Sequence, residues 1–177
     1  MEDGLRSAMI DPLTGVYNRR YAMPRLAGIA EQAQSEGSEF AVMVVDLDRF
    51  KSVNDRHGHA AGDAVLAEIA RRLSDNLRMS DLLARYGGEE FLVALPQTGL
   101  AEARQVAERL RGVIGDTPVT LPSGQGLTVT VSIGVSVITT EQCAAADVAG
   151  LIERADLALM SSKTSGRNLV TFDQTAA

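Results

Sequence analysis

Tryptophan is absent from this 177-residue sequence, and aromatic residues make up only 4% of it. Hydrophobic residues nonetheless account for 45% of the chain. A chain of this length and composition can bury a substantial core, and a core with so few aromatic rings must be aliphatic. We therefore expect an ordinary globular protein of one domain.

The sequence contains one cysteine, Cys143, which excludes an intramolecular disulfide framework and a cysteine zinc site. No stretch approaches the roughly 20 apolar residues that a membrane span requires. The first residues, "MEDGLRSAMI", lack the basic start and apolar middle of a signal peptide. These features favour a cytoplasmic protein of bacterial type without a membrane segment.

Positive charge is also scarce, since 17 Lys and Arg residues face 23 Asp and Glu residues, giving a net charge of -6. Binding to long nucleic acids needs a surplus of basic side chains. We therefore expect no nucleic-acid partner, although a local basic pocket for a single nucleotide is compatible with this composition.

The pattern of apolar residues predicts helices and strands along the whole chain. In order, these are a helix from an Asn18 cap to about Ser35, a strand at 39–47, a helix at 61–78, strands at 81–86 and 90–95, a helix at 100–114, a strand at 127–138, a helix at 147–162 and a strand at 168–172. Residues alternate from Leu127 to Val137, which predicts a strand with one buried face.

The core order β-α-β-β-α-β is that of ferredoxin-like folds. We predict an α/β (α+β) fold of this palm type, with a central mixed, mainly antiparallel sheet flanked by helices. A ligand would bind on an open side of the sheet or at its rim. The sequence shows no repeat or linker, so we assign 10–173 to one domain, 1–9 to the end of a connecting helix and 174–177 to a tail.

Two aspartates, Asp46 and Asp48, stand where the Val-rich strand ends. Alternate side chains of a strand point to the same side, and Asp is a poor strand residue. Either residue could simply form a turn or cap a helix. A charged group beside a buried strand otherwise needs a partner or a cation.

A second acidic pair, Glu89 and Glu90, follows Gly87 and Gly88 in "ARYGGEEFLVALP". The two glycines predict a hairpin because glycine accepts the positive φ of a tight turn. If this hairpin lies beside the first strand, three or four carboxylates meet on one rim and repel each other. A hard cation such as Mg²⁺ or Mn²⁺ would relieve that repulsion and would suit phosphoryl transfer.

One alternative is an aspartyl phosphatase, because "VMVVDLD" is similar to the Asp-x-Asp start of haloacid dehalogenase-type enzymes. Asp46 would then be the nucleophile and Asp48 the acid. That family needs a later acidic pair at another parallel strand end, and usually a Gly or Thr soon after the second Asp. Here Arg49 and Phe50 follow, and the later acidic pair lies in a hairpin.

Five ordered blocks resemble one family across residues 10–172. "GGEEF" is similar to the signature of GGDEF-domain diguanylate cyclases in its Glu variant, and "VDLDRFKSVNDRHGHAAGD" resembles the first strand and following loop of that family. "DPLTGVYNRR", "TVSIGVS" and "ADLALMSSKTSGRN" resemble its entry segment, closing strand and last helix. The resemblance is strongest to the output domains of response-regulator cyclases.

The resemblance implies an enzyme that makes cyclic di-GMP and two pyrophosphates from two GTP, one held by each chain of a homodimer. It implies two Mg²⁺ or Mn²⁺ ions, held by the side chains of Asp46 and Glu89 and by the carbonyl of Leu47. Glu89 would also be the base for the 3′-hydroxyl, with Glu90 a second candidate. Lys51 would stabilise developing charge.

The resemblance also implies a substrate-binding set, which comprises Asn54, His59, Asp63, Arg49, Phe50, Lys163 and Arg167. Asn54 and Asp63 would pair with the guanine edge, and backbone amides near Arg49 would cradle phosphate at a helix start. Each assignment has a structural alternative. Lys163 and Arg167 could serve the dipole of a helix end, and Asn54 and Asp63 could be helix caps.

"RMSD", from Arg78 to Asp81, resembles the family's Arg-x-x-Asp product-inhibition site, with Arg109 as a further contact. An Arg side chain can stack on guanine and pair with phosphate. The structural alternative is that Arg78 ends a helix and Asp81 begins a turn.

Two residues depart from the family pattern: Met160 replaces the usual aromatic, and Ser162 replaces a common alanine. The second functional hypothesis is therefore a weak or non-catalytic module that senses GTP or cyclic di-GMP. The retained Asp46, Glu89 and Lys51 favour the active enzyme. The sequence shows no receiver or sensor region, so we expect any regulatory domain to lie outside this chain.

Overall fold

A computed structural model describes residues 8–139 and 147–173 of the protein. Its helices are α2 (Arg19–Glu36), α3 (Phe50–His57), α4 (His59–Asp75), α5 (Leu100–Gly115) and α7 (Val148–Thr164). Its strands are β1 (Tyr17–Asn18), β2 (Phe40–Leu47), β3 (Leu82–Arg85), β4 (Glu90–Pro96), β5 (Val119–Thr120), β6 (Gly126–Leu127), β7 (Val131–Ile138) and β8 (Val170–Phe172). The predicted tail at 174–177, and residues 1–7 of the predicted connecting helix, lie outside the described residues.

Six strands form the main sheet in the order β1-β3-β4-β2-β7-β8, and β5 and β6 form a separate pair. The central strand β2 is antiparallel to both β4 and β7, and β3 is antiparallel to β4. Only the outer pairs β1–β3 and β7–β8 are parallel. This arrangement confirms the predicted ferredoxin-like sheet.

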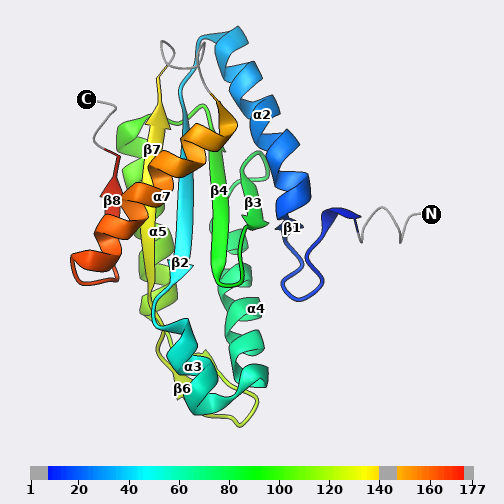
Figure 1. Ribbon diagram of the computed structural model, residues 1–177, viewed down its shortest axis with the longest axis vertical. Coiled ribbons are helices and arrows are strands. Elements are labelled where there is room, and N and C mark those ends of the chain that lie inside the picture. The colour runs from blue at the N-terminus through cyan, green and yellow to red at the C-terminus, as the bar shows by residue number, and fades with distance from the viewer. Residues whose placement is uncertain (1–7, 140–146, 174–177) are drawn as a thin grey trace.

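Helices cover both faces of this sheet (Figure 1). The helices α4 and α5 pack on one face, and α2 and α7 pack on the other. Phe40 and Phe91 are the aromatic members of the largest fully buried side chains, and the remainder of that group is aliphatic. Because neither face is open, the rim of the sheet is the place left for a ligand.

The strand that alternates in sequence is buried on both faces, so the prediction of one buried face was wrong. All eight residues of β7 are buried, including the polar Ser132 and Ser136. The alternation did not reveal this because α7 covers the side on which small and polar residues lie. The regular strand also starts at Val131, four residues after Leu127.

A glycine on β7 permits α7 to approach the sheet. A Cβ added to Gly134 would overlap the backbone of Ala155 and Leu159 in α7. Any side chain here would push the helix outward. The close approach carries the C-terminal turn of α7 to the rim where β2 ends.

The helical predictions were confirmed with shifted boundaries. The Asn18 side chain accepts a hydrogen bond of 2.9 Å from the amide of Tyr21 and so caps α2, as predicted. The helix predicted at 61–78 runs from His59 to Asp75, and the short helix α3 precedes it. Gly58 joins the two helices with a left-handed φ of 88°. Among the described residues, no helix combines the length and apolar character needed to cross a membrane.

Candidate active site

The candidate site lies at the rim where β2 ends. The sheet register places Asp46 opposite Glu90 of β4 on one side and opposite Ser132 of β7 on the other. The amide of Leu47 donates a hydrogen bond of 3.2 Å to the carbonyl of Glu89. The two acidic pairs therefore come together, as the sequence predicted.

The Gly87–Gly88 hairpin is present, but the conformational reason given for it was wrong. Neither glycine is among the residues with positive φ. A Cβ on Gly87 would lie 3.0 Å from Oε1 of Glu90, which is tighter than normal contact. A side chain at Gly87 would therefore displace the flexible end of Glu90 slightly.

Asp46 carries the one buried carboxylate oxygen in the described part of this rim that lacks a hydrogen bond. Its Oδ1 is buried and has no hydrogen bond. Burial is the main cause that raises the pKa of Asp46 to about 7. The charge of Lys163 opposes this rise, and the charges of Glu89, Glu90 and Asp48 add to it. A buried oxygen with neighbouring carboxylates fits a hard cation. The described side chains form no cluster of three or more His, Cys, Asp or Glu ligands. A cation bound here would complete its coordination with backbone carbonyls, water or phosphate oxygens.

Lys163 reaches this rim from the last turn of α7. Its Nζ lies 2.9 Å from Oδ1 of Asp48, 3.4 Å from the carbonyl oxygen of Leu47 and 3.7 Å from Oδ1 of Asp46. The ammonium group thus forms ion pairs with both aspartates at the end of β2. The structure places Lys163 beside the predicted metal ligands.

Asp48 differs from Asp46, although both leave the strand on the same side. Its carboxylate accepts hydrogen bonds from the Thr130 hydroxyl (2.7 Å), the Ser132 hydroxyl (2.7 Å), Lys163 (2.9 Å) and the Asn168 amide (3.0 Å). Burial alone would raise the pKa of Asp48, but hydrogen bonds from Lys163, Ser132 and Thr130 outweigh it and lower the pKa. Asp48 is an anchored carboxylate rather than a free ligand.

The predicted guanine-binding residues lie on two helices that meet at Gly58. Asn54 lies on α3, while His59 and Asp63 lie exposed at the start of α4. The sequence reasoning missed Gly62, where a Cβ would overlap Oδ1 of Asn54. Its one available signal was a glycine inside a helical pattern, which often marks close packing.

The predicted phosphate cradle lies at the start of α3. Arg49 is the N-cap, adopts a left-handed φ of 57° and provides no side-chain cap. First-turn amides of a helix lack intrahelical acceptors and suit an anion. Lys51 lies exposed on the same turn, and Phe50 is partly buried.

Arg167 follows α7 in an unusual turn. Arg167 and Asn168 have φ values of 65° and 51°, a conformation that few non-glycine residues adopt. Their amides donate to the Ser162 carbonyl (3.0 Å) and to Asp48 (3.0 Å), and the Arg167 side chain is exposed. The tight turn after α7 therefore depends on the buried Asp48.

The Arg-x-x-Asp residues form a second cluster at the other end of β3 and β4. The Arg78 guanidinium pairs with Asp81 at 3.0 Å and donates to the Pro96 carbonyl and the Thr98 hydroxyl at 3.0 and 3.1 Å. Arg109 donates to the Asn76 carbonyl, two residues before Arg78. The structure thus brings together the residues predicted for this site.

Comparison with known proteins identifies the family. The family model "Diguanylate cyclase, GGDEF domain" matches residues 8–169. The chain belongs to this GGDEF family. The antiparallel pairing of β2 with the GGEEF strand also disfavours the phosphatase alternative, which needed a parallel strand end.

Relatives of this GGDEF domain are longer proteins. The response regulator PleD of Caulobacter vibrioides is 42% identical over 171 residues, which cover 96% of this chain and 37% of PleD. The diguanylate cyclase DgcP of Pseudomonas aeruginosa is 40% identical over 168 residues, which cover 95% of this chain and 24% of DgcP.

Solved structures agree with the fold. The coiled coil and GGDEF domain of DgcB from Caulobacter crescentus, in complex with c-di-GMP, matches with a TM-score of 0.90 and 30% identity. The match covers 97% of this chain and 88% of the DgcB chain.

The departures from the family pattern have different surroundings. Ser162 is buried, donates to the Ile133 carbonyl at 3.0 Å and lies 2.6 Å from the Thr171 hydroxyl. It therefore ties α7 to β7 and β8. Met160 is 60% exposed on α7 and is not one of the buried core residues.

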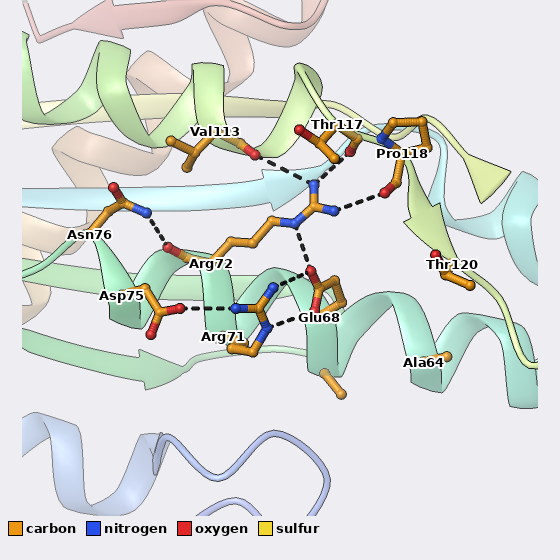
Figure 2. Close-up of a pocket in the computed structure, with 11 residues that line it drawn as sticks. Ala64, Glu68, Arg71, Arg72, Asp75, Asn76, Val113, Thr117, Pro118 and Thr120 are labelled. Carbon is orange, nitrogen blue, oxygen red and sulfur yellow. Dashed lines mark hydrogen bonds and ion pairs between the residues drawn. The ribbon is translucent and has the colours of Figure 1, made fainter.

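A polar concavity of about 730 Å³ lies between α4 and α5, away from this rim (Figure 2). The buried Arg72 donates there to the carbonyls of Ile114, Thr117 and Pro118 at 2.7–3.0 Å, and Glu68 binds Arg72 at 2.8 Å. Figure 2 shows Arg72 turned toward Glu68, Thr117 and Pro118. Arg72 therefore satisfies carbonyls of the last turn of α5 and of the segment after it, which is a structural role.

Proposed function

We propose that this domain condenses two GTP into cyclic di-GMP and two pyrophosphates. The observation that carries the proposal is the buried, unsatisfied Oδ1 of Asp46 in a rim shared with Glu89 and Glu90. Membership of the GGDEF family and the relatives named as diguanylate cyclases support it. The cytoplasmic location and a regulatory domain outside this chain belong to the same proposal.

In this mechanism, Asp46, Glu89 and the Leu47 carbonyl would hold divalent cations, Mg²⁺ or Mn²⁺. Bound cations neutralise triphosphate charge and favour ionisation of an attacking hydroxyl. Glu89 would accept the proton of the 3′-hydroxyl, and Glu90 would support the acidic rim. Burial, followed by the charges of Asp156 and Glu89, raises the pKa of Glu90.

The substrate would lie at the rim, between the junction of α3 with α4 and the end of α7. Asn54 and Asp63, with His59 beside them, would pair with the guanine edge. The amides of Phe50 and Lys51 would face phosphate at the start of α3. Lys163 and Arg167 would approach the triphosphate from the opposite side, and the Lys51 side chain would offset charge on the α-phosphate.

Two chains are required because each holds one GTP. The 3′-oxygen of one GTP forms a bond to the α-phosphorus of the other. The bond from that phosphorus to the bridging oxygen of pyrophosphate breaks, and pyrophosphate leaves. Two such transfers close the ring. Product bound at Arg78, Asp81 and Arg109 would then inhibit the enzyme.

The decisive experiment is product analysis by chromatography after incubation with GTP and Mg²⁺ at several protein concentrations. We expect cyclic di-GMP, formed at a rate that rises more than linearly with protein concentration. Glu89→Gln should abolish synthesis while leaving nucleotide binding mostly intact. Synthesis that survives this change would show that Glu89 is neither the base nor an essential ligand.

The other outcomes separate the alternatives. GTP binding without product at any protein concentration would favour a sensory module. Release of inorganic phosphate would favour a phosphatase.

A further inference from the structure

The carboxylate of Asp48 is buried and fully hydrogen-bonded by separate parts of the chain. Its side chain is only 3% exposed. Oδ1 accepts from Ser132 and Lys163, and Oδ2 accepts from Thr130 and the amide of Asn168. A carboxylate offers about four lone-pair positions, so these four donors leave it no capacity for another ligand.

The donors fall into two groups with different effects. Thr130 and Ser132 lead into and begin β7, so they fix the carboxylate to the rigid sheet. Lys163 and Asn168 belong to the end of α7 and the turn after it. Asp48 therefore fastens the end of α7 and the turn after it to the sheet.

The helix end and turn held in this way carry two of the three basic side chains proposed for the triphosphate, Lys163 and Arg167. Lys163 contacts Asp48 directly. Arg167 immediately precedes Asn168, and both residues have positive φ, a conformation that non-glycine residues rarely keep without support. The bond from the Asn168 amide to Oδ2 contributes to that support. The turn is also held by the bond from the Arg167 amide to the Ser162 carbonyl and by the bond from Arg111 to the Asn168 side chain. The exposed Arg167 side chain has no other described bond that sets its direction.

We propose that Asp48 is a positioning residue that aims Lys163 and Arg167 at the phosphates of the bound nucleotide. The inference rests on the proposed function, because it needs a nucleoside triphosphate at the rim. The two aspartates at the end of β2 then have different roles: Asp46 would bind the cation, and Asp48 would orient Lys163 and Arg167.

The test compares two ligands that share guanine and ribose but differ in phosphate. Calorimetry with Mg²⁺ present measures the affinity for the α,β-methylene analogue of GTP, which cannot release pyrophosphate, and for GMP. Asp48→Asn should weaken binding of the triphosphate analogue by about tenfold, the effect of one charged hydrogen bond. Binding of GMP should change less than about twofold.

A double-mutant cycle tests whether Asp48 acts through Lys163. In a Lys163→Gln background, Asp48→Asn should weaken binding of the analogue by less than it does in the wild type, because part of the shared interaction is already lost. Asp116→Asn, at the exposed end of α5, is the matched control and should leave both affinities unchanged.

Several results would overturn the inference. Equal losses for the analogue and GMP would show a general structural role for Asp48, as would full additivity with Lys163→Gln. Unchanged affinity for the analogue, in a protein that makes cyclic di-GMP, would remove this inference and leave the proposed function standing. A wild-type protein that binds neither ligand would overturn both.

A milder variant keeps the test valid if Asp48→Asn does not fold. Ser132→Ala removes the hydroxyl that shares Oδ1 with Lys163 and leaves the carboxylate in place. We expect it to weaken binding of the analogue about threefold with unchanged GMP affinity, because the carboxylate keeps its other three donors. An unchanged ratio of the two affinities would contradict the proposal.

Discussion

The side-chain amide of Asn54 lies directly over Gly62, one turn into the next helix. A Cβ at Gly62 would overlap Oδ1 of Asn54 and lie 3.2 Å from Cζ of Phe50. The Asn54 amide, proposed to pair with guanine, can therefore take this position only because Gly62 has no side chain.

Gly62→Ala should weaken recognition of the base without lowering the stability of the fold. Alanine favours the interior of α4 over glycine by up to about 1 kcal/mol, while the Asn54 side chain has to rotate away. We expect GTP to bind about tenfold more weakly, as when a directed hydrogen bond is lost, with little change in the urea midpoint. Gly28→Ala, which meets nothing within 4 Å, is the control. Unchanged GTP affinity would mean that Asn54 does not read the base.

Arg78→Ala should relieve product inhibition without lowering the initial rate. Asp81 keeps its 2.7 Å hydrogen bond from the Arg78 amide, so the local turn should persist. We expect the inhibition constant of cyclic di-GMP to rise at least about tenfold, since a charged hydrogen-bond donor is lost. Progress curves with added product measure this, with the exposed Arg20→Ala as control. Inhibition that persists in Arg78→Ala would exclude this site.

The element order was predictable because each segment carries its own apolar periodicity. The position of Asp46 beside Glu89 was also predictable, since a hairpin strand of this fold pairs with the first strand. The surroundings of Asp48 were not predictable, because its partners lie 82 to 120 residues away along the chain. The double burial of β7 was hidden for a related reason: a small polar residue such as Ser136 looks exposed in a sequence and is covered only after α7 packs.

Gly134→Ala should destabilise the fold and displace α7. The added methyl would overlap backbone atoms of Ala155 and Leu159, which cannot rotate away as a side chain can. Overpacking of this kind costs about 1–3 kcal/mol in the free energy of unfolding. Urea denaturation measures the loss, and Gly28→Ala again serves as control. A variant as stable as the wild type would show that α7 does not pack this closely.

Glu68→Gln should reduce stability in a pH-dependent way. Hydrogen bonds from Arg71 and Arg72 lower the pKa of Glu68 from 4.5 to about 2, although burial acts in the opposite direction. A lowered folded-state pKa adds stability that is complete above the unfolded-state pKa and is lost as pH falls through the folded-state value. At pH 7 we expect a loss of about 1–2 kcal/mol.

The same difference should shrink as the pH falls from about 4.5 toward about 2, which urea denaturation at a series of pH values can follow. Glu108→Gln, which breaks the more exposed ion pair with Arg111 at 2.9 Å, is the matched control. Exposed pairs contribute little, so its effect should be small across the same range. A Glu68→Gln deficit that stays constant down to pH ~3 would show that the charge of Glu68 is not what holds Arg72 at the end of α5.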